Sequence, residues 1–199
     1  MRILMLALML CLGAGGAMAA EYKNAVFAGG CFWCLEAPFR MMPGVQGVLS
    51  GYMGGAMPNP SYEAVCTGMT GHAEVIRISF DASRVSFGEL LAVFFALHDP
   101  TTLNRQGHDI GTQYRSAIFY HSDRQRIEAE AAIDALNEAG PWGSPVVTQV
   151  EPADIFYPAE DYHQDYYARH PDKAYCMAVI APKVAKMREM LADSIKSGG

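Results

Sequence analysis

Two cysteines separated by two residues, Cys31 and Cys34, are the part of the chain best suited to chemistry. They lie in the stretch GGCFWCLE at 29–36, after a predicted strand at 22–27 and before a predicted helix at 35–40. The two glycines allow a tight strand-to-helix turn, which would place Cys31 at or near the first turn of the helix. Unpaired N–H groups and the helix dipole favour a thiolate there, so we expect a nucleophilic cysteine with a lowered pKa.

Two aromatic residues, Phe32 and Trp33, separate these cysteines and would supply an apolar floor beside a reactive sulfur. Most lone cysteines are buried and inert. The flanking glycines, the aromatic pair and the second cysteine make an inert role the poorer interpretation of Cys31.

Glu74 is a candidate general acid at the start of the clearest predicted strand, residues 73–80. A period of two places it on the same face as Ile76, Ile78 and Phe80. A desolvated carboxyl tends to stay protonated near neutral pH, as a general acid must. Strand ends also commonly carry carboxylates just outside a core, and this strand alone would favour that simpler interpretation.

The remaining pattern mixes strands and helices in irregular order. It predicts strands at 45–52, 113–120 and 146–150, one helical turn at 61–66, and helices at 86–98, 123–139 and 182–194. A long polar loop at 99–112 would be functional or disordered. Together these elements indicate a single α+β domain, a sheet with helices packed on it.

Residues 1–20 are typical of a signal peptide, with Arg2, an apolar run at 3–12 and an Ala-Met-Ala cleavage site at 17–19. We therefore expect a single mature domain at 21–199 and a periplasmic or secreted protein without stable membrane association. The net charge of −6 without a basic cluster argues against a nucleic-acid partner. We also expect a monomer.

Five short motifs, in order along the chain, resemble those of the A-type peptide methionine sulfoxide reductases (the MsrA family). They are GCFW at 30–33, PNPSY at 58–62, GHAE at 71–74, DIGTQYRS at 109–116 and AEDYHQ at 159–164. The resemblance covers roughly residues 24–185. It implies a two-layer α/β sandwich with a ferredoxin-like core and extensive coil. It also implies thiol-dependent reduction of the S epimer of methionine sulfoxide, free or protein-bound, without metal or organic cofactor and with recycling by a thioredoxin-like protein.

The resemblance assigns roles position by position. Cys31 matches the nucleophile and Glu74 the acid, while Phe32 and Trp33 match the pocket for the substrate's S-methyl group. The other matched positions are two tyrosines that bind the sulfoxide oxygen and a carboxylate of the same site: Tyr62, Tyr114 and Asp109.

Two cysteines are candidates for the second thiol, which would form a disulfide with Cys31 after the first step. Cys176 matches the family's first recycling cysteine and is our first choice, although the glycine-rich tail with a further cysteine is absent. Cys34 stands where relatives often have glycine and is the alternative, alone or in relay. Cys66 is expected to be a packing residue near the site, and His163 to have no catalytic role.

Other functions fit less well. A C-x-x-C thiol–disulfide oxidoreductase is the main alternative, but it gives no role to Glu74 or to residues 109–116. Structural zinc sites favour two close cysteine pairs, and this chain has one, Cys31 and Cys34. A non-catalytic binding protein is the third alternative.

Overall fold

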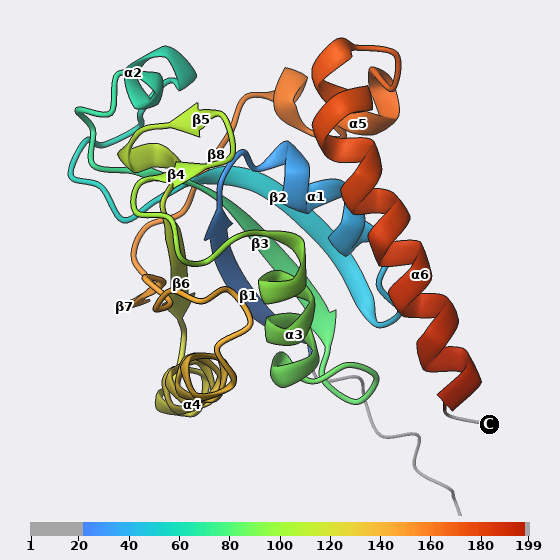
Figure 1. Cartoon of the computed structure of the whole chain (residues 1–199). Helices are drawn as coiled ribbons and strands as arrows, with labels where there is room; N and C mark the ends of the chain where they lie inside the picture. Colours follow the sequence, from blue (N-terminus) through green and yellow to red (C-terminus); the bar gives the residue numbers. More distant parts are fainter. Residues whose placement is uncertain (1–21, 198–199) are drawn as a thin grey trace, which may run out of the picture.

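The computed structural model describes residues 22–197, whose centre is a six-stranded sheet (Figure 1). The strands lie in the order β7-β6-β1-β3-β2-β8 and are antiparallel except for the parallel pair β6 and β7. Their bounds are β1 Tyr22–Gly29, β2 Val45–Met53, β3 Ala73–Asp81, β6 Ser116–Tyr120, β7 Gln149–Pro152 and β8 Tyr157–Pro158.

One face of the sheet carries four helices: α1 (Trp33–Arg40), α3 (Phe87–Leu97), α4 (Asp123–Ala139) and α6 (Ala181–Ser197). The main cluster of buried apolar side chains lies between these helices and the sheet. The opposite face buries a smaller cluster, against which Ala153 and Phe156 pack. The elements β1, α1, β2, β3, α3 and β6 follow the ferredoxin-like order, with β1 and β3 at the centre. The predicted two-layer α+β fold is therefore confirmed.

Short elements gather at the end of the sheet where β1 finishes (Figure 1). They are α2 (Tyr62–Cys66), the hairpin β4 (Arg105–Gln106) and β5 (Asp109–Ile110), 3-10 turns Thr112–Tyr114 and Asp161–His163, α5 (Tyr166–Arg169), and the π-helical turn Cys176–Ile180 before α6. These short elements supply most of the side chains that surround the cysteine pair.

Capping residues explain where the helices begin and end. Ser86 and Glu89 form a capping box at α3. Ser122 caps α4, which ends at Gly140 in the left-handed conformation. Ser61 accepts a bond from the N–H of Ala64 and begins α2.

Three boundaries differ from the sequence prediction. The loop expected at 99–112 contains the β4–β5 hairpin, whose two-residue strands are too short for a periodic pattern. The strand expected at 113–120 begins at Ser116, because the residues before it form a 3-10 turn. The strand expected at 146–150 is Gln149–Pro152.

The predicted signal peptide lies outside the described residues. Within 22–197, no helix is both long and apolar enough to span a bilayer.

Candidate active site

The turn that carries Cys31 needs both preceding glycines. Gly29 ends β1, where a Cβ would lie 2.9 Å from a ring carbon of Phe94 in α3. Gly30 has a φ of +91°, and a Cβ there would come within 2.6 Å of a β4 side chain. Phe32 is the N-cap of α1, so Cys31 lies immediately before the first helical turn, as predicted.

Glu74 lies in the core, only 2% exposed, beside the residue that follows the nucleophile. Its Oε2 accepts a 3.0 Å hydrogen bond from the backbone N–H of Phe32. Burial raises the pKa of Glu74 to about 8; the Phe32 hydrogen bond opposes this, and the charge of Asp109 adds to it. The carboxyl is therefore protonated at neutral pH, and the simpler interpretation of this strand end, a carboxylate just outside the core, is wrong.

Tyr62 and Tyr114 approach Glu74 from two different short elements, α2 and the 3-10 turn before β6. Both are half-buried. Burial, with the nearby Cys66 thiol and the Glu74 carboxyl, raises the pKa of Tyr62. Burial and Glu74 likewise raise the pKa of Tyr114. Both hydroxyls thus keep their protons and can donate to a substrate oxygen.

The Cys31 and Cys34 thiols are both buried. Burial, then the Cys34 thiol, raises the pKa of Cys31 well above its usual value. The neighbouring Cys31 thiol lowers the pKa of Cys34 against the effect of burial, and the charge of Lys183 adds to the lowering. The expected lowering at Cys31 is therefore wrong for the substrate-free site, because burial and neighbouring negative groups outweigh the helix end.

A hydroxyl joins Cys34 to Asp109. The Tyr175 Oη lies 3.4 Å from the Cys34 Sγ and donates a 2.7 Å hydrogen bond to Asp109 Oδ2. Asp109 comes from the β4–β5 hairpin and Tyr175 from the residue before the π-helical turn. Sequence reasoning missed Tyr175, although its position next to Cys176 was a signal.

Aromatic rings form a wall beside the cysteines. Trp33 stacks on Tyr166 with ring centroids 3.7 Å apart and planes 6° apart. The ring centroid of Phe32 lies 6.0 Å from that of Trp33 and 5.9 Å from that of Tyr52, and Tyr175 meets Trp33 edge-on at 6.1 Å. The structure thus brings the predicted pair Phe32 and Trp33 together and adds tyrosines that sequence reasoning missed.

Glu160 links this wall to α2. Its carboxylate accepts bonds from the Tyr52 hydroxyl at 2.8 Å and from the Tyr62 backbone N–H at 2.9 Å. His163 packs its ring on Tyr62 at 4.3 Å and on Phe32 at 5.2 Å. Neither of its ring nitrogens has a hydrogen-bond partner within residues 22–197, and burial lowers its pKa. The His163 ring is therefore a packed, neutral side chain between Tyr62 and Phe32.

Polar side chains fasten the segment between β8 and α5 to the rest of the molecule. The Gln164 amide bonds both backbone groups of Ser50 at 3.0 Å, as a neighbouring strand would. The buried Glu36 carboxylate accepts from the Asp165 N–H at 2.9 Å, and Arg40 pairs with the Asp165 side chain at 2.8 Å. These contacts fix the ring of Tyr166, one residue further on, against α1.

The two remaining cysteines differ in exposure. Cys176 is fully buried, and burial followed by the charge of Cys34 raises its pKa. Cys66, expected to be a packing residue, is instead exposed, because it ends a short surface helix. Burial, opposed by the Tyr62 hydroxyl, raises the pKa of its thiol. All four cysteines of the described chain are reduced.

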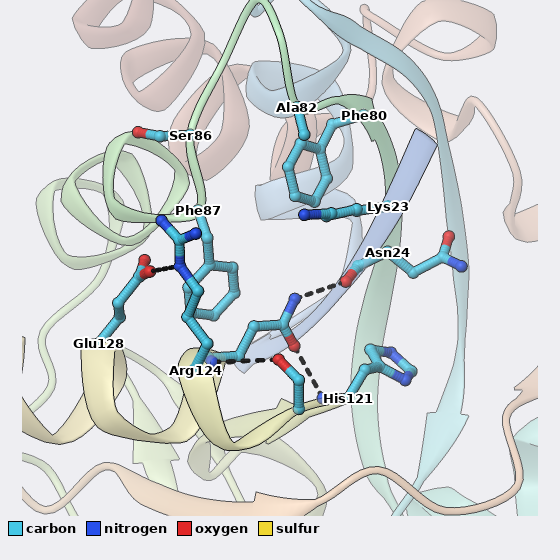
Figure 2. Close-up of a pocket in the computed structure, with 11 residues that line it drawn as sticks. Lys23, Asn24, Phe80, Ala82, Ser86, Phe87, His121, Arg124 and Glu128 are labelled. Atoms are coloured by element: carbon cyan, nitrogen blue, oxygen red, sulfur yellow. Dashed lines mark hydrogen bonds and ion pairs between the residues drawn. The ribbon is translucent and has the colours of Figure 1, made fainter. Parts of the chain in front are cut away.

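The cleft shown in Figure 2, about 530 Å³, lies elsewhere. It opens where β1 begins and β3 ends, lined by Lys23 and Phe80, whereas Cys31 follows the other end of β1. Across it the Gln125 amide donates to Asn24 O at 2.8 Å and accepts from His121 N at 2.7 Å. None of the predicted site residues lines this cleft.

Residues 22–197 contain no group of three or more His, Cys, Asp and Glu side chains arranged to hold a metal ion. In particular, the four thiols do not converge, since Cys66 is at the surface and Cys176 in the core.

Known sequences resemble this chain over most of its length. The family model described as Peptide methionine sulfoxide reductase matches residues 23–195. A peptide methionine sulfoxide reductase MsrA of Deinococcus radiodurans is 54% identical over 177 residues, which is 89% of this chain and 86% of that protein.

Solved structures resemble it as well. Mxr1 from Saccharomyces cerevisiae in its reduced form is 37% identical, with a TM-score of 0.73 over 78% of this chain and 90% of that one. Mxr1 in complex with Trx2 is 25% identical over the matched region, with a TM-score of 0.52 over 76% and 91%. Together with the family model, which spans residues 23–195, these likenesses show that the chain belongs to the peptide methionine sulfoxide reductase family.

Proposed function

We propose that this protein reduces the S epimer of methionine sulfoxide, free or within a polypeptide, to methionine with its own thiols. The observation that carries the proposal is the protonated carboxyl of Glu74, bonded to the backbone of the residue after Cys31. A general thiol–disulfide oxidoreductase would have no use for such an acid. A sulfoxide reductase needs one, because the sulfoxide oxygen must be protonated as it leaves sulfur.

The first step uses the acid and the nucleophile together. Glu74 donates its proton to the sulfoxide oxygen while the Tyr62 and Tyr114 hydroxyls bond the same oxygen. Charge builds there in the transition state, so these donors stabilise it more than the bound substrate. The Cys31 thiol gives up its proton to solvent as its sulfur attacks, methionine leaves, and Cys31 becomes a sulfenic acid.

The same arrangement selects the epimer. The faces of the Phe32 and Trp33 rings, backed by Tyr166, accept a methyl group but offer the oxygen no hydrogen-bond donor. The oxygen must therefore point toward Glu74, which leaves one configuration at sulfur able to present itself to Cys31.

Cys34 is the resolving thiol in this proposal, in place of the first choice from sequence, Cys176. What supports Cys34 is its position in the same turn as Cys31: its backbone N–H donates a 3.0 Å hydrogen bond to the Cys31 carbonyl, and both thiols are buried. Cys176, fully buried in the turn before α6, is assigned the second role, as a relay that receives the disulfide from Cys34.

A thioredoxin-like protein would reduce the final disulfide by exchange. The likeness to yeast Mxr1, whose structure with Trx2 is known, supports this kind of reductant. The signal-peptide pattern of residues 1–20 supports a periplasmic or secreted site of action. Every residue in the scheme comes from one chain, so we propose that it works as a monomer.

Single turnover of the pre-reduced mature protein with each epimer tests the proposal. We expect methionine from the S epimer only, two thiols lost, and a Cys31–Cys34 linkage in peptide mapping. Cys176→Ser should still form this linkage, whereas Cys34→Ser should make methionine and stop at the sulfenic acid. No methionine from either epimer would overturn the function, and a Cys31–Cys176 linkage would overturn only the assignment of Cys34.

A further inference from the structure

A continuous chain of hydrogen bonds runs from the Cys34 sulfur through the Tyr175 hydroxyl to the Asp109 carboxylate, over distances of 3.4 and 2.7 Å. We propose that Tyr175 is a catalytic residue of the resolving step, which passes the proton of the Cys34 thiol to Asp109. This inference rests on the proposed function and on Cys34 as the resolving thiol.

Cys34 needs such an exit for its proton because its thiol is buried, only 3% exposed. A thiol does not attack sulfur until it loses its proton. Bulk water reaches this thiol poorly, so the proton must pass to a neighbouring group, and the Tyr175 oxygen lies 3.4 Å away.

The resolving step then balances as follows. The Cys34 sulfur forms the S–S bond as the S–O bond of the Cys31 sulfenic acid breaks, so Cys34 is oxidised and Cys31 reduced. The Cys34 proton moves to the Tyr175 oxygen while the Tyr175 proton moves to Asp109. The departing oxygen takes a proton from solvent and leaves as water.

The Tyr175 hydroxyl can accept a proton from Cys34 and donate its own proton to Asp109 in the same step. Burial, followed by the charges of the two cysteines, raises the pKa of Tyr175, so a free tyrosinate does not form. Its one proton already points to Asp109, which leaves its oxygen free to accept from Cys34. Asp109 is half-buried and stands on a surface hairpin, so it can release the proton to water.

Other charged or titratable groups also act on Cys34 and must be considered in any pH profile. Cys34 itself lies in α1. Strand β3 contributes Glu74, and the C-terminal segment contributes Cys176 and Lys183. Lys183 favours the Cys34 thiolate but donates its own bond to the carbonyl of Leu97, so it is not the proton acceptor. Within the described residues, Tyr175 is the side chain that connects Cys34 to a carboxylate.

Tyr175→Phe tests the proposal, because it removes one oxygen and keeps the ring that packs edge-on against Trp33. Pre-reduced variant and wild type are mixed with one equivalent of the S epimer. Methionine release and loss of the second thiol are followed separately, and a dimedone-type probe traps the sulfenic acid. Tyr167→Phe is the matched control, a half-buried tyrosine in α5 whose hydroxyl bonds no other described residue.

We expect Tyr175→Phe to release methionine at nearly the wild-type rate but to form the Cys31–Cys34 disulfide about a hundredfold more slowly at neutral pH. The trapped sulfenic acid should accumulate, and alkaline pH should restore the rate as hydroxide removes the Cys34 proton directly. Tyr167→Phe should match the wild type.

An unchanged rate of disulfide formation, or a slow rate that alkaline pH does not raise, would overturn the role of Tyr175. Loss of methionine release in the wild type would instead overturn the proposed function, so the two failures are distinguishable.

Discussion

The two carboxyl groups of the site stand in opposite surroundings. Glu74 lies within the central strand β3, 2% exposed, with a backbone N–H as its bonding partner. Asp109 lies on a two-residue strand at the rim and accepts a bond from a tyrosine hydroxyl. Burial raises the pKa of Glu74 to about 8. The difference assigns a proton donor to one side of the cysteine pair and a proton acceptor to the other.

The same difference separates two half-reactions. The sulfoxide meets Cys31 on the Glu74 side, where dry surroundings keep an acid protonated. The second thiol, Cys34, meets the hydrogen-bonded chain to Asp109, where a proton can leave. Changes at the shared sulfur should therefore stop both halves, and changes at either carboxyl should affect mainly its own half.

Cys31→Ser should have the largest effect, because both sides of the site act on this sulfur. We expect methionine formation to fall to background in single and multiple turnovers, since a hydroxyl is a far weaker nucleophile than a thiolate. Cys66→Ser is the control, because it removes an exposed thiol at the rim and should keep turnover within a few-fold. Methionine release by Cys31→Ser would mean that Cys31 is not the sulfur on which both half-reactions act.

Glu74→Gln should slow the sulfoxide step by about a hundredfold or more, the usual contribution of a general acid. The amide oxygen of the introduced glutamine can still accept the bond from the Phe32 N–H, so substrate binding should change little. In the wild type, the single-turnover rate should fall as pH rises through about 8, because Glu74 then loses the proton that it must donate. This alkaline limb should be absent in the variant.

Asp109→Asn is the control for the pH dependence of the single-turnover rate. Because this variant keeps Glu74, its rate should still fall as pH rises through about 8. A near-normal single-turnover rate in Glu74→Gln would remove Glu74 as the acid.

Burial of Glu74, which keeps the acid protonated for catalysis, should lower the stability of the folded protein at alkaline pH. The folded protein holds the Glu74 proton up to about pH 8, whereas an ordinary glutamate releases it near 4.5. Between these values the folded state binds more protons, so its free energy of unfolding should fall as pH rises. Above pH 8, Glu74→Gln should therefore be more stable than wild type by about 2–4 kcal/mol.

Urea unfolding at pH 5 and pH 8.5 checks this expectation, with Asp109→Asn as the control. Equal pH dependence in wild type and Glu74→Gln would mean that burial of Glu74 costs no stability.

The sequence predicted the parts of the site that lie on regular elements. The alternation of β3 made Glu74 a candidate, which the resemblance then selected, and Cys31 was found because two glycines precede a helix. The helices predicted at 86–98 and 123–139 correspond to α3 and α4 for a similar reason: a short local pattern sets the structure.

Tyr175 and Tyr166 were not found, because their roles depend on contacts across more than a hundred residues of chain. No period or spacing within a local window encodes that Tyr175 bonds Cys34 and Asp109, or that Tyr166 stacks on Trp33. The lowered pKa expected for Cys31 failed for a related reason. The helix end is local, but the burial and the Cys34 thiol that outweigh it come from tertiary packing and pairing.

The smallest effect should come from Tyr166, the ring of the aromatic wall that stacks on Trp33 and bonds neither Glu74 nor Asp109. Tyr166→Leu removes a stacked ring, 3.7 Å from Trp33, that holds the floor of the methyl pocket in place. Because such aromatic pairs contribute about 0.5–1.5 kcal/mol, we expect KM to rise roughly two- to tenfold while kcat changes little. Tyr166→Phe keeps the stack and should behave as wild type. Steady-state kinetics on the S epimer separates the outcomes. A fall in kcat with unchanged KM would mean that Tyr166 takes part in the chemistry, and that the aromatic wall does more than bind the methyl group.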